Sequence, residues 1–308
     1  MTQMSTNLKF DRAISQIGVT QDRVSKAQMQ MTEGKQILKP SDAPDKSSQI
    51  TRLKSAIDRQ ESYVATIKQV RDKLAQQETA VKGATEVMFR LKELSVQAAN
   101  DTYSAADRKS IAIEVKELRN QMLSLANTQD VNGNFIFSGT RVGQLAFAAN
   151  EDGRVVYQGD QSIASADIAD NNIADTNRPG TRPFDKIVRT DDTGKQHAVG
   201  FFEAVDDLIA GLNTNNIKTV QRSVGEMATM QQGLSDSLAA IGATDNKLEN
   251  QQSIADENLL RMKTLLSDEE DVDMTKTITQ MNKDMLSLQA GQTAFAKIAE
   301  LSLFNYIR

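Results

Sequence analysis

The densest group of side chains that could do chemistry is the acidic run Ser267–Asp273, SDEEDVD, which holds five carboxylates. Carboxylate oxygens are the ligands that calcium prefers, but the run lacks the loop glycine and the ligand spacing of an EF-hand. Acidic residues are also favoured in the first turn of a helix. Because Glu270 lies three residues after Ser267, the run predicts a capping box that opens the last helix, and not a metal site.

Candidate nucleophiles and bases occur singly along the chain. His197 is the only histidine, and neither Ser41 nor Ser138 has a partner histidine or lies in a nucleophile elbow. The chain has no cysteine, and no glycine-rich segment matches a phosphate-binding loop. We therefore expect no catalytic residue, no cofactor site and no metal site.

The composition favours long helices over a thick globular core. Of the 308 residues 39% are hydrophobic and only 5% aromatic, and the net charge is −5. A net negative charge does not attract nucleic acid or an anionic membrane, so we expect neither as a partner. The first residues lack the basic and apolar regions of a signal peptide, so export, if it occurs, is expected to follow another route.

Heptad spacing is the main structural signal. A narrow apolar stripe recurs every seven residues from Phe10 to Leu38, with small residues on its other edge, and "LKPSDAPDK" ends it at two prolines. A second stripe predicts a continuous helix from Asp45 to about Asn100, and Ser104 with Asp107 predicts the capping box of a shorter one. Helical spacing returns after "FFEAVDDLIAGL" and continues to the end of the chain.

The middle of the chain has a different character. Residues 131–200 hold eight of the 16 glycines, and Asn132-Gly133 is a hairpin turn signal. The segments "FIFSG", "LAFAA" and "RVVYQG" predict short strands. We predict a mainly α fold with a β-rich insert, in which N- and C-terminal segments pair as a long antiparallel helical coiled coil or rod. The predicted parts are terminal helices 1–43 with 267–308, a helical rod 44–130 with 210–266, and a surface insert 131–209.

Four segments resemble the flagellin superfamily and follow one another in its order. They are "GKQILKPSDAP", "LKELSVQAANDTYSAADRKSIAIEVKEL", "LANTQDVNGNFIFSGT" and the terminal "LSLFNYI". The resemblance covers about residues 5–145 and 210–308. Pro44 in "SDAPDKS", the segment "FIFSGT" and the end "LSLFNYIR" are more similar to the hook–filament junction branch than to filament flagellins.

The resemblance implies a structural adaptor that joins the hook of a bacterial flagellum to its filament. Its implied partners are copies of itself in a ring, a neighbouring hook-associated protein, flagellin and an export chaperone. The implied location is outside the cell, after flagellar type III export without a cleaved signal peptide. A flagellin-like filament subunit is the alternative, and a surface adhesin or enzyme in the insert is a third possibility.

The terminal stripes predict an intermolecular surface. Fixing each residue costs about 1–2 kcal/mol, and two narrow helices bury little apolar area at about 25 cal/mol per Å². We therefore expect the terminal helices to be largely disordered in the free chain, with unprotected amides, and to become ordered on assembly. The predicted assembly residues are Phe10, Ile17, Val24, Met31, Leu38, Met274, Ile278, Met281, Met285, Leu288, Phe295, Leu301, Leu303, Phe304, Tyr306 and Ile307.

Overall fold

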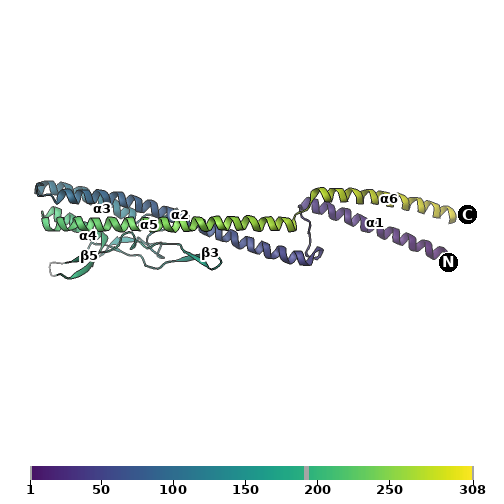
Figure 1. Ribbon diagram of the computed structural model, residues 1–308, viewed down its shortest axis with the longest axis horizontal. Helices are drawn as coiled ribbons and strands as arrows, with labels where there is room; N and C mark the ends of the chain where they lie inside the picture. The colour runs from purple at the N-terminus through teal and green to yellow at the C-terminus, as the bar shows by residue number, and fades with distance from the viewer. Residues whose placement is uncertain (1, 191–193, 307–308) are drawn as a thin grey trace. The chain divides into compact units, whose positions relative to one another are not determined.

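The computed structural model describes residues 2–190 and 194–306, with side chains described at position 8 and from 10 to 297 outside that gap (Figure 1). The chain forms two compact units. The terminal unit comprises residues 1–59 with 258–308, and the central unit comprises residues 60–257. This mainly helical architecture with a small β insert confirms the predicted fold class.

Two long helices, α2 (Pro44–Ala98) and α5 (Ile217–Glu270), run through the central unit side by side (Figure 1). The predicted rod helix is confirmed, since α2 begins at Pro44, where proline suits the first turn. From Ile67 to Met88 its apolar stripe is buried in the core, as predicted from the heptad spacing, whereas Leu53 and Val64 are half-buried. Arg71 binds Asp245 through two nitrogens at 2.8 and 3.2 Å, and Lys92 donates to Gln231, so the two helices are antiparallel.

Two shorter helices complete the helical part of the central unit. Helix α3 (Ala105–Ala126) begins with the predicted capping box, in which Asp107 N donates to Ser104 Oγ at 3.2 Å. Helix α4 (Phe201–Asn213) packs on α3. The prediction that helix returns only after "FFEAVDDLIAGL" was wrong, because this segment is itself α4. Its buried apolar residues recur three or four apart, which places them on one helix face.

The insert consists of three separate antiparallel hairpins. The paired strands are β1 (Phe147–Ala149) with β2 (Val155–Tyr157), β3 (Ser165–Ala169) with β4 (Asn172–Asp175), and β5 (Ile187–Thr190) with β6 (Gln196–Val199). The prediction of strands in "LAFAA" and "RVVYQG" is confirmed.

The prediction of a strand in "FIFSG" was wrong. The turn at Asn132-Gly133 forms, with Gly133 at φ +81°, but the residues on its two sides pair only through an isolated bridge between Gln129 and Phe135. The chain then turns inward, because Phe137 is 1% exposed and packs edge-to-face against the ring of Phe184 at 5.7 Å. Burial of this aromatic side chain outweighs strand pairing.

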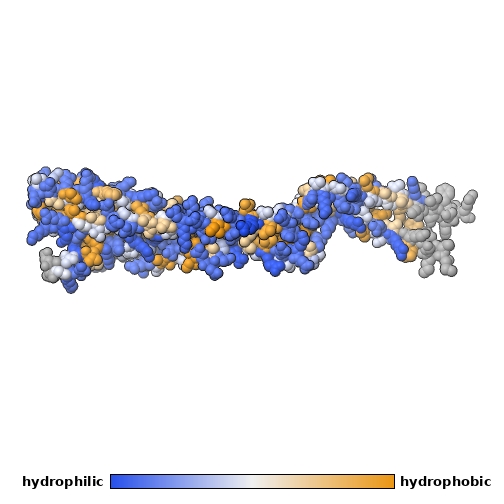
Figure 2. All heavy atoms as spheres, viewed as in Figure 1, coloured by the Kyte–Doolittle hydropathy of each residue, from blue (hydrophilic) through white to orange (hydrophobic). Residues whose placement is uncertain are grey.

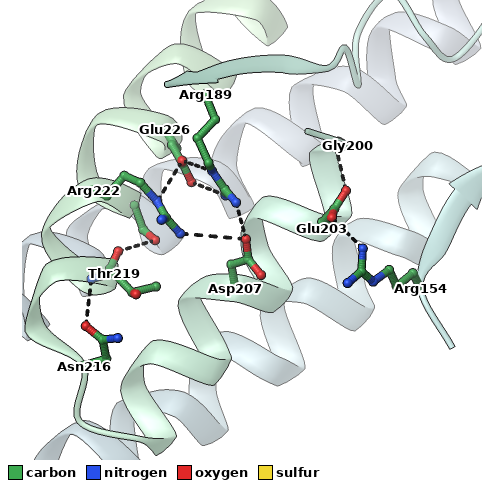
Figure 3. Close-up of polar contacts among 10 residues, drawn as sticks. Arg154, Arg189, Gly200, Glu203, Asp207, Asn216, Thr219, Arg222 and Glu226 are labelled. Carbon is green, nitrogen blue, oxygen red and sulfur yellow. Dashed lines mark hydrogen bonds and ion pairs between the residues drawn. The ribbon is translucent and has the colours of Figure 1, made fainter. Parts of the chain in front are cut away.

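An arginine on β5 joins the insert to the helices of the central unit (Figure 3). Arg189 donates from Nε and Nη2 to the carboxylate of Glu226 on α5 at 2.7 and 3.0 Å, and from Nη1 to Asp207 on α4. Burial opposes the charge on Arg189, but the two carboxylates outweigh it and raise its pKa. One side chain therefore fixes three elements with charge-assisted hydrogen bonds.

Candidate assembly surface

The terminal unit presents two long helices packed against each other, α1 (Thr2–Glu33) and α6 (Met274–Tyr306) (Figure 1). The rings of Phe10 and Phe295 meet edge-to-face with centroids 5.4 Å apart. A Cβ atom at Gly291 would lie 3.6 Å from Cγ1 of Ile17. The predicted stripes of the two ends of the chain therefore face each other within the terminal unit.

The predicted start of the last helix was wrong. Ser267 lies inside α5, where its hydroxyl donates to Asp271, and α6 begins seven residues later at Met274. Asp273 caps α6, since Lys276 N donates to its Oδ1 at 3.0 Å. The helix breaks between Glu270 and Asp273 because Val272 N donates to the carbonyl of Gly34 instead of to its own helix.

The predicted assembly residues divide by exposure. Among those on α6, Met274, Ile278 and Met285 stay exposed. The others whose side chains are described are half-buried: Phe10, Ile17, Val24, Met31, Leu38, Met281, Leu288 and Phe295. The side chains of Leu301, Leu303, Phe304 and Tyr306, and all of Ile307, lie outside the described residues. The assembly role of the whole set stays a prediction.

Sequence reasoning missed a second set of apolar side chains on the same helices. Leu8 is 52% exposed, and Val19 is exposed as well. Eleven residues correspond to about three helical turns, so these two share one side, nearly opposite the side of α1 that faces α6. These residues do not lie on the heptad positions. Their apolar character was visible in the sequence, but they form no periodic stripe that would have singled them out. Its members are Leu8, Ile14, Val19, Met29 and Leu286.

Exposed apolar side chains therefore occur on several sides of this helix pair. On the face that Figure 2 shows, apolar side chains of the pair are interspersed with polar ones. A helix that is apolar on more than one side is usually buried among other helices. Among the described residues of the terminal unit, α1 and α6 are long neighbours of each other.

The contact between α1 and α6 is also incompletely filled. A groove of about 230 Å³ lies between them, and its lining includes Ile17, Leu288 and Phe295 together with Ala13 and Gly291. Small side chains on one edge leave this space, because bulky residues on the other edge meet little side-chain volume. The groove can accept apolar side chains from outside.

The side chains singled out for chemistry have other partners. His197 lies exposed on β6 opposite Arg189, and Ser138 is buried and donates to the carbonyl of Phe135. Of the acidic run, Glu269 lies 3.0 Å from Lys46 Nζ, and Glu270 binds Lys35 and Lys54. Across residues 2–190 and 194–306, no three His, Asp or Glu side chains are grouped to hold a metal ion. Nor is any helix in those ranges long and apolar enough to cross a membrane.

The chain has a flagellin-type fold, and the model of the bacterial flagellin N-terminal helical region matches residues 4–142. It is similar along almost its whole length to flagellar hook-associated protein 3 of Escherichia coli (strain K12). The two are 29% identical over 316 residues, which cover 98% of this chain and 99% of the relative. These matches confirm the resemblance to flagellin-type proteins and to their hook-associated branch.

Two further similar proteins align with a smaller share of this chain. Flagellin FlaB2 of Treponema pallidum (strain Nichols) is 26% identical over 223 residues, which cover 71% of this chain and 69% of that protein. The crystal structure of flagellar hook associated protein-3 from Legionella pneumophila has a TM-score of 0.64 at 17% identity, covering 71% of this chain and 98% of that one. This structure shows the fold. The hook-associated sequence aligns end to end, whereas the flagellin aligns over part of each chain.

Proposed function

We propose that the chain is the structural adaptor that joins the hook of the bacterial flagellum to its filament, with no enzymatic activity. The observation that carries the proposal is the end-to-end similarity to a flagellar hook-associated protein 3. The apolar side chains left exposed on α1 and α6 supply a physical means of assembly. Neighbouring subunits cover those faces and fill the groove between the helices.

The proposal assigns the three predicted parts different tasks. The terminal helices, 1–43 with 267–308, form the assembly surface. The helical part, 44–130 with 210–266 and joined by α4, holds the subunit rigid, and the strand-bearing part of the predicted insert, 131–200, faces outward. The partners are further copies of the chain in a ring, a neighbouring hook-associated protein and flagellin. An export chaperone binds the chain before it leaves the cell by the flagellar export route.

The alternative is a flagellin-like filament subunit, which the partial similarity to a flagellin favours. Electron microscopy of a strain that lacks the gene separates the two. An adaptor predicts intact hooks without filaments, and flagellin released into the medium in monomeric form. Restoring the gene should restore filaments. Short or structurally altered filaments still joined to hooks would contradict the adaptor and support the filament subunit.

A further inference from the structure

The two chain segments that lead into α2 and out of α5 meet as a short antiparallel pair. Gln36 N donates to the carbonyl of Glu270 at 2.7 Å, and Val272 N donates to the carbonyl of Gly34 at 3.0 Å. Lys35 lies opposite Asp271 between these two bonds. We call the segments Gly34–Gln36 and Glu270–Val272 the linker clasp.

The backbone at Gly34 allows the clasp to form directly at the end of α1. Gly34 has φ +70°, a left-handed conformation that glycine adopts without strain and that commonly ends helices. The helix therefore stops after Glu33, and the next residues extend beside the end of α5.

The side chain of Glu270 is the centre of the clasp. It is 10% exposed, and its Oε1 lies 2.8 Å from Lys54 Nζ and 2.9 Å from Lys35 Nζ. Burial opposes ionisation of Glu270, but the two ammonium groups outweigh it and lower its pKa. The hydrogen bond to Glu270 in turn raises the pKa of Lys35. Two ion pairs on one carboxylate therefore join three segments: Lys35 after the end of α1, Lys54 on α2 and Glu270 at the end of α5.

The heptad contacts between α1 and α6 do not by themselves select one alignment. A stripe that repeats every seven residues packs in a similar way after a slide of one repeat, and small residues such as Ala13 and Gly291 resist the slide little. Buried polar groups are the best-attested means of selecting register in helix pairs.

The observed alignment agrees with the clasp. Lys35 pairs with Asp271, Ile17 lies beside Gly291, and Phe10 meets Phe295. Nearly equal lengths of chain separate these contacts from the clasp along α1 and along α6, as an antiparallel pair in a single register requires.

We propose that Glu270 is a positioning residue, which fixes the register of α1 against α6 by holding the linker clasp closed. The clasp thus decides which apolar side chains the helix pair presents together on the proposed assembly surface. The inference deepens that proposed function, but its test uses the purified chain alone. If the hook–filament role proved wrong, the role of Glu270 in fixing the register could still be correct. If Glu270 proved not to fix the register, the hook–filament role would be unaffected.

Disulfide trapping measures the register, because the chain has no cysteine of its own. The double variant Ile17→Cys/Gly291→Cys reports the observed alignment. The double variant Val24→Cys/Gly291→Cys reports a slide of one heptad. Each pair is oxidised with copper phenanthroline in dilute full-length chain, and the intramolecular disulfide is quantified by non-reducing electrophoresis. We expect the first pair to cross-link efficiently and the second to cross-link poorly.

Adding Glu270→Gln is expected to lower the yield of the Ile17/Gly291 disulfide at least about fivefold, since it removes the carboxylate charge that Lys35 and Lys54 share. The yield of the Val24/Gly291 disulfide should rise. Lys54→Met should have a smaller effect in the same direction, because the contact between Lys35 and Glu270 remains. Glu269→Gln is the matched control, since Glu269 pairs with Lys46 outside the clasp, and it should change neither yield.

Far-UV circular dichroism establishes that each variant keeps its helices before oxidation. Unchanged yields in Glu270→Gln would overturn the proposal, and so would equal shifts in Glu269→Gln, which would indicate a general effect of charge. If Glu270→Gln unfolds the chain, Lys54→Met decides in the same way.

Discussion

A chain that ends at Gly291 is expected to be exported at the normal level and to leave hooks without filaments. The truncation removes the end of α6, including Phe295, whose ring packs against Phe10. Helix α1 would then keep its exposed apolar side chains but lose the part of α6 that packs on it. Neighbouring subunits would therefore find only part of the proposed assembly surface. Because the clasp and the central unit lie before Gly291, they should fold as in the full-length chain.

The measurement combines electron microscopy of hooks with immunoblots of the medium for the truncated chain and for flagellin. Full-length chain carrying Gln289→Ala is the control, since this residue is polar and exposed on the same helix, and it should support normal filaments. Filaments attached to hooks in the truncated strain would contradict the assembly role of the C-terminal residues. Retention of the truncated chain in the cells would contradict the expectation of normal export.

Arg189→Ala is expected to lower the free energy of unfolding of the central unit by about 3 kcal/mol, since breaking a buried ion pair typically costs 3–5 kcal/mol. The substitution leaves the carboxylate of Glu226, which is 8% exposed, without its bidentate partner (Figure 3). Arg222 remains 3.2 Å from Glu226, so the loss should fall at the lower end of that range. Urea denaturation of the purified chain, followed by circular dichroism, measures the change.

Arg154→Ala is the matched control for this experiment. Arg154 also joins the insert to α4, through Glu203 at 2.9 Å, but its side chain is 65% exposed. Exposed ion pairs contribute about 0–1 kcal/mol, so this variant should unfold at nearly the parental urea concentration. Equal losses in the two variants would show that the insert is not held mainly by Arg189.

Sequence periodicity predicted the helical framework well, because its signals are local. The start of α2 at Pro44 and the capping box at Ser104 and Asp107 depend on residues within one turn of each other. The start of α6 could not be predicted in this way. Ser267 and Glu270 have the spacing of a capping box, yet the end of α5 is decided by a backbone contact with Gly34, far away in the sequence.

The insert and the candidate assembly surface were predicted less completely, because they too depend on contacts between residues far apart in the sequence. "FIFSG" has strand-forming residues, but the burial of Phe137 against the ring of Phe184 depends on a segment more than 40 residues away. Facing stripes on the two ends of the chain were visible as heptads. The linker clasp was not, since Lys35, Lys54 and Glu270 share no periodic pattern and meet only in the folded chain.

Amide hydrogen exchange, followed residue by residue, tests most directly whether neighbouring subunits complete the terminal helices. In the purified monomer, we expect amides of α1 and α6 that lie beyond the contact between Ile17 and Gly291 to exchange rapidly, with protection increasing along both helices toward the linker clasp. In isolated flagella, the same amides should exchange slowly. Terminal helices that are as well protected in the monomer as the central unit would contradict the account.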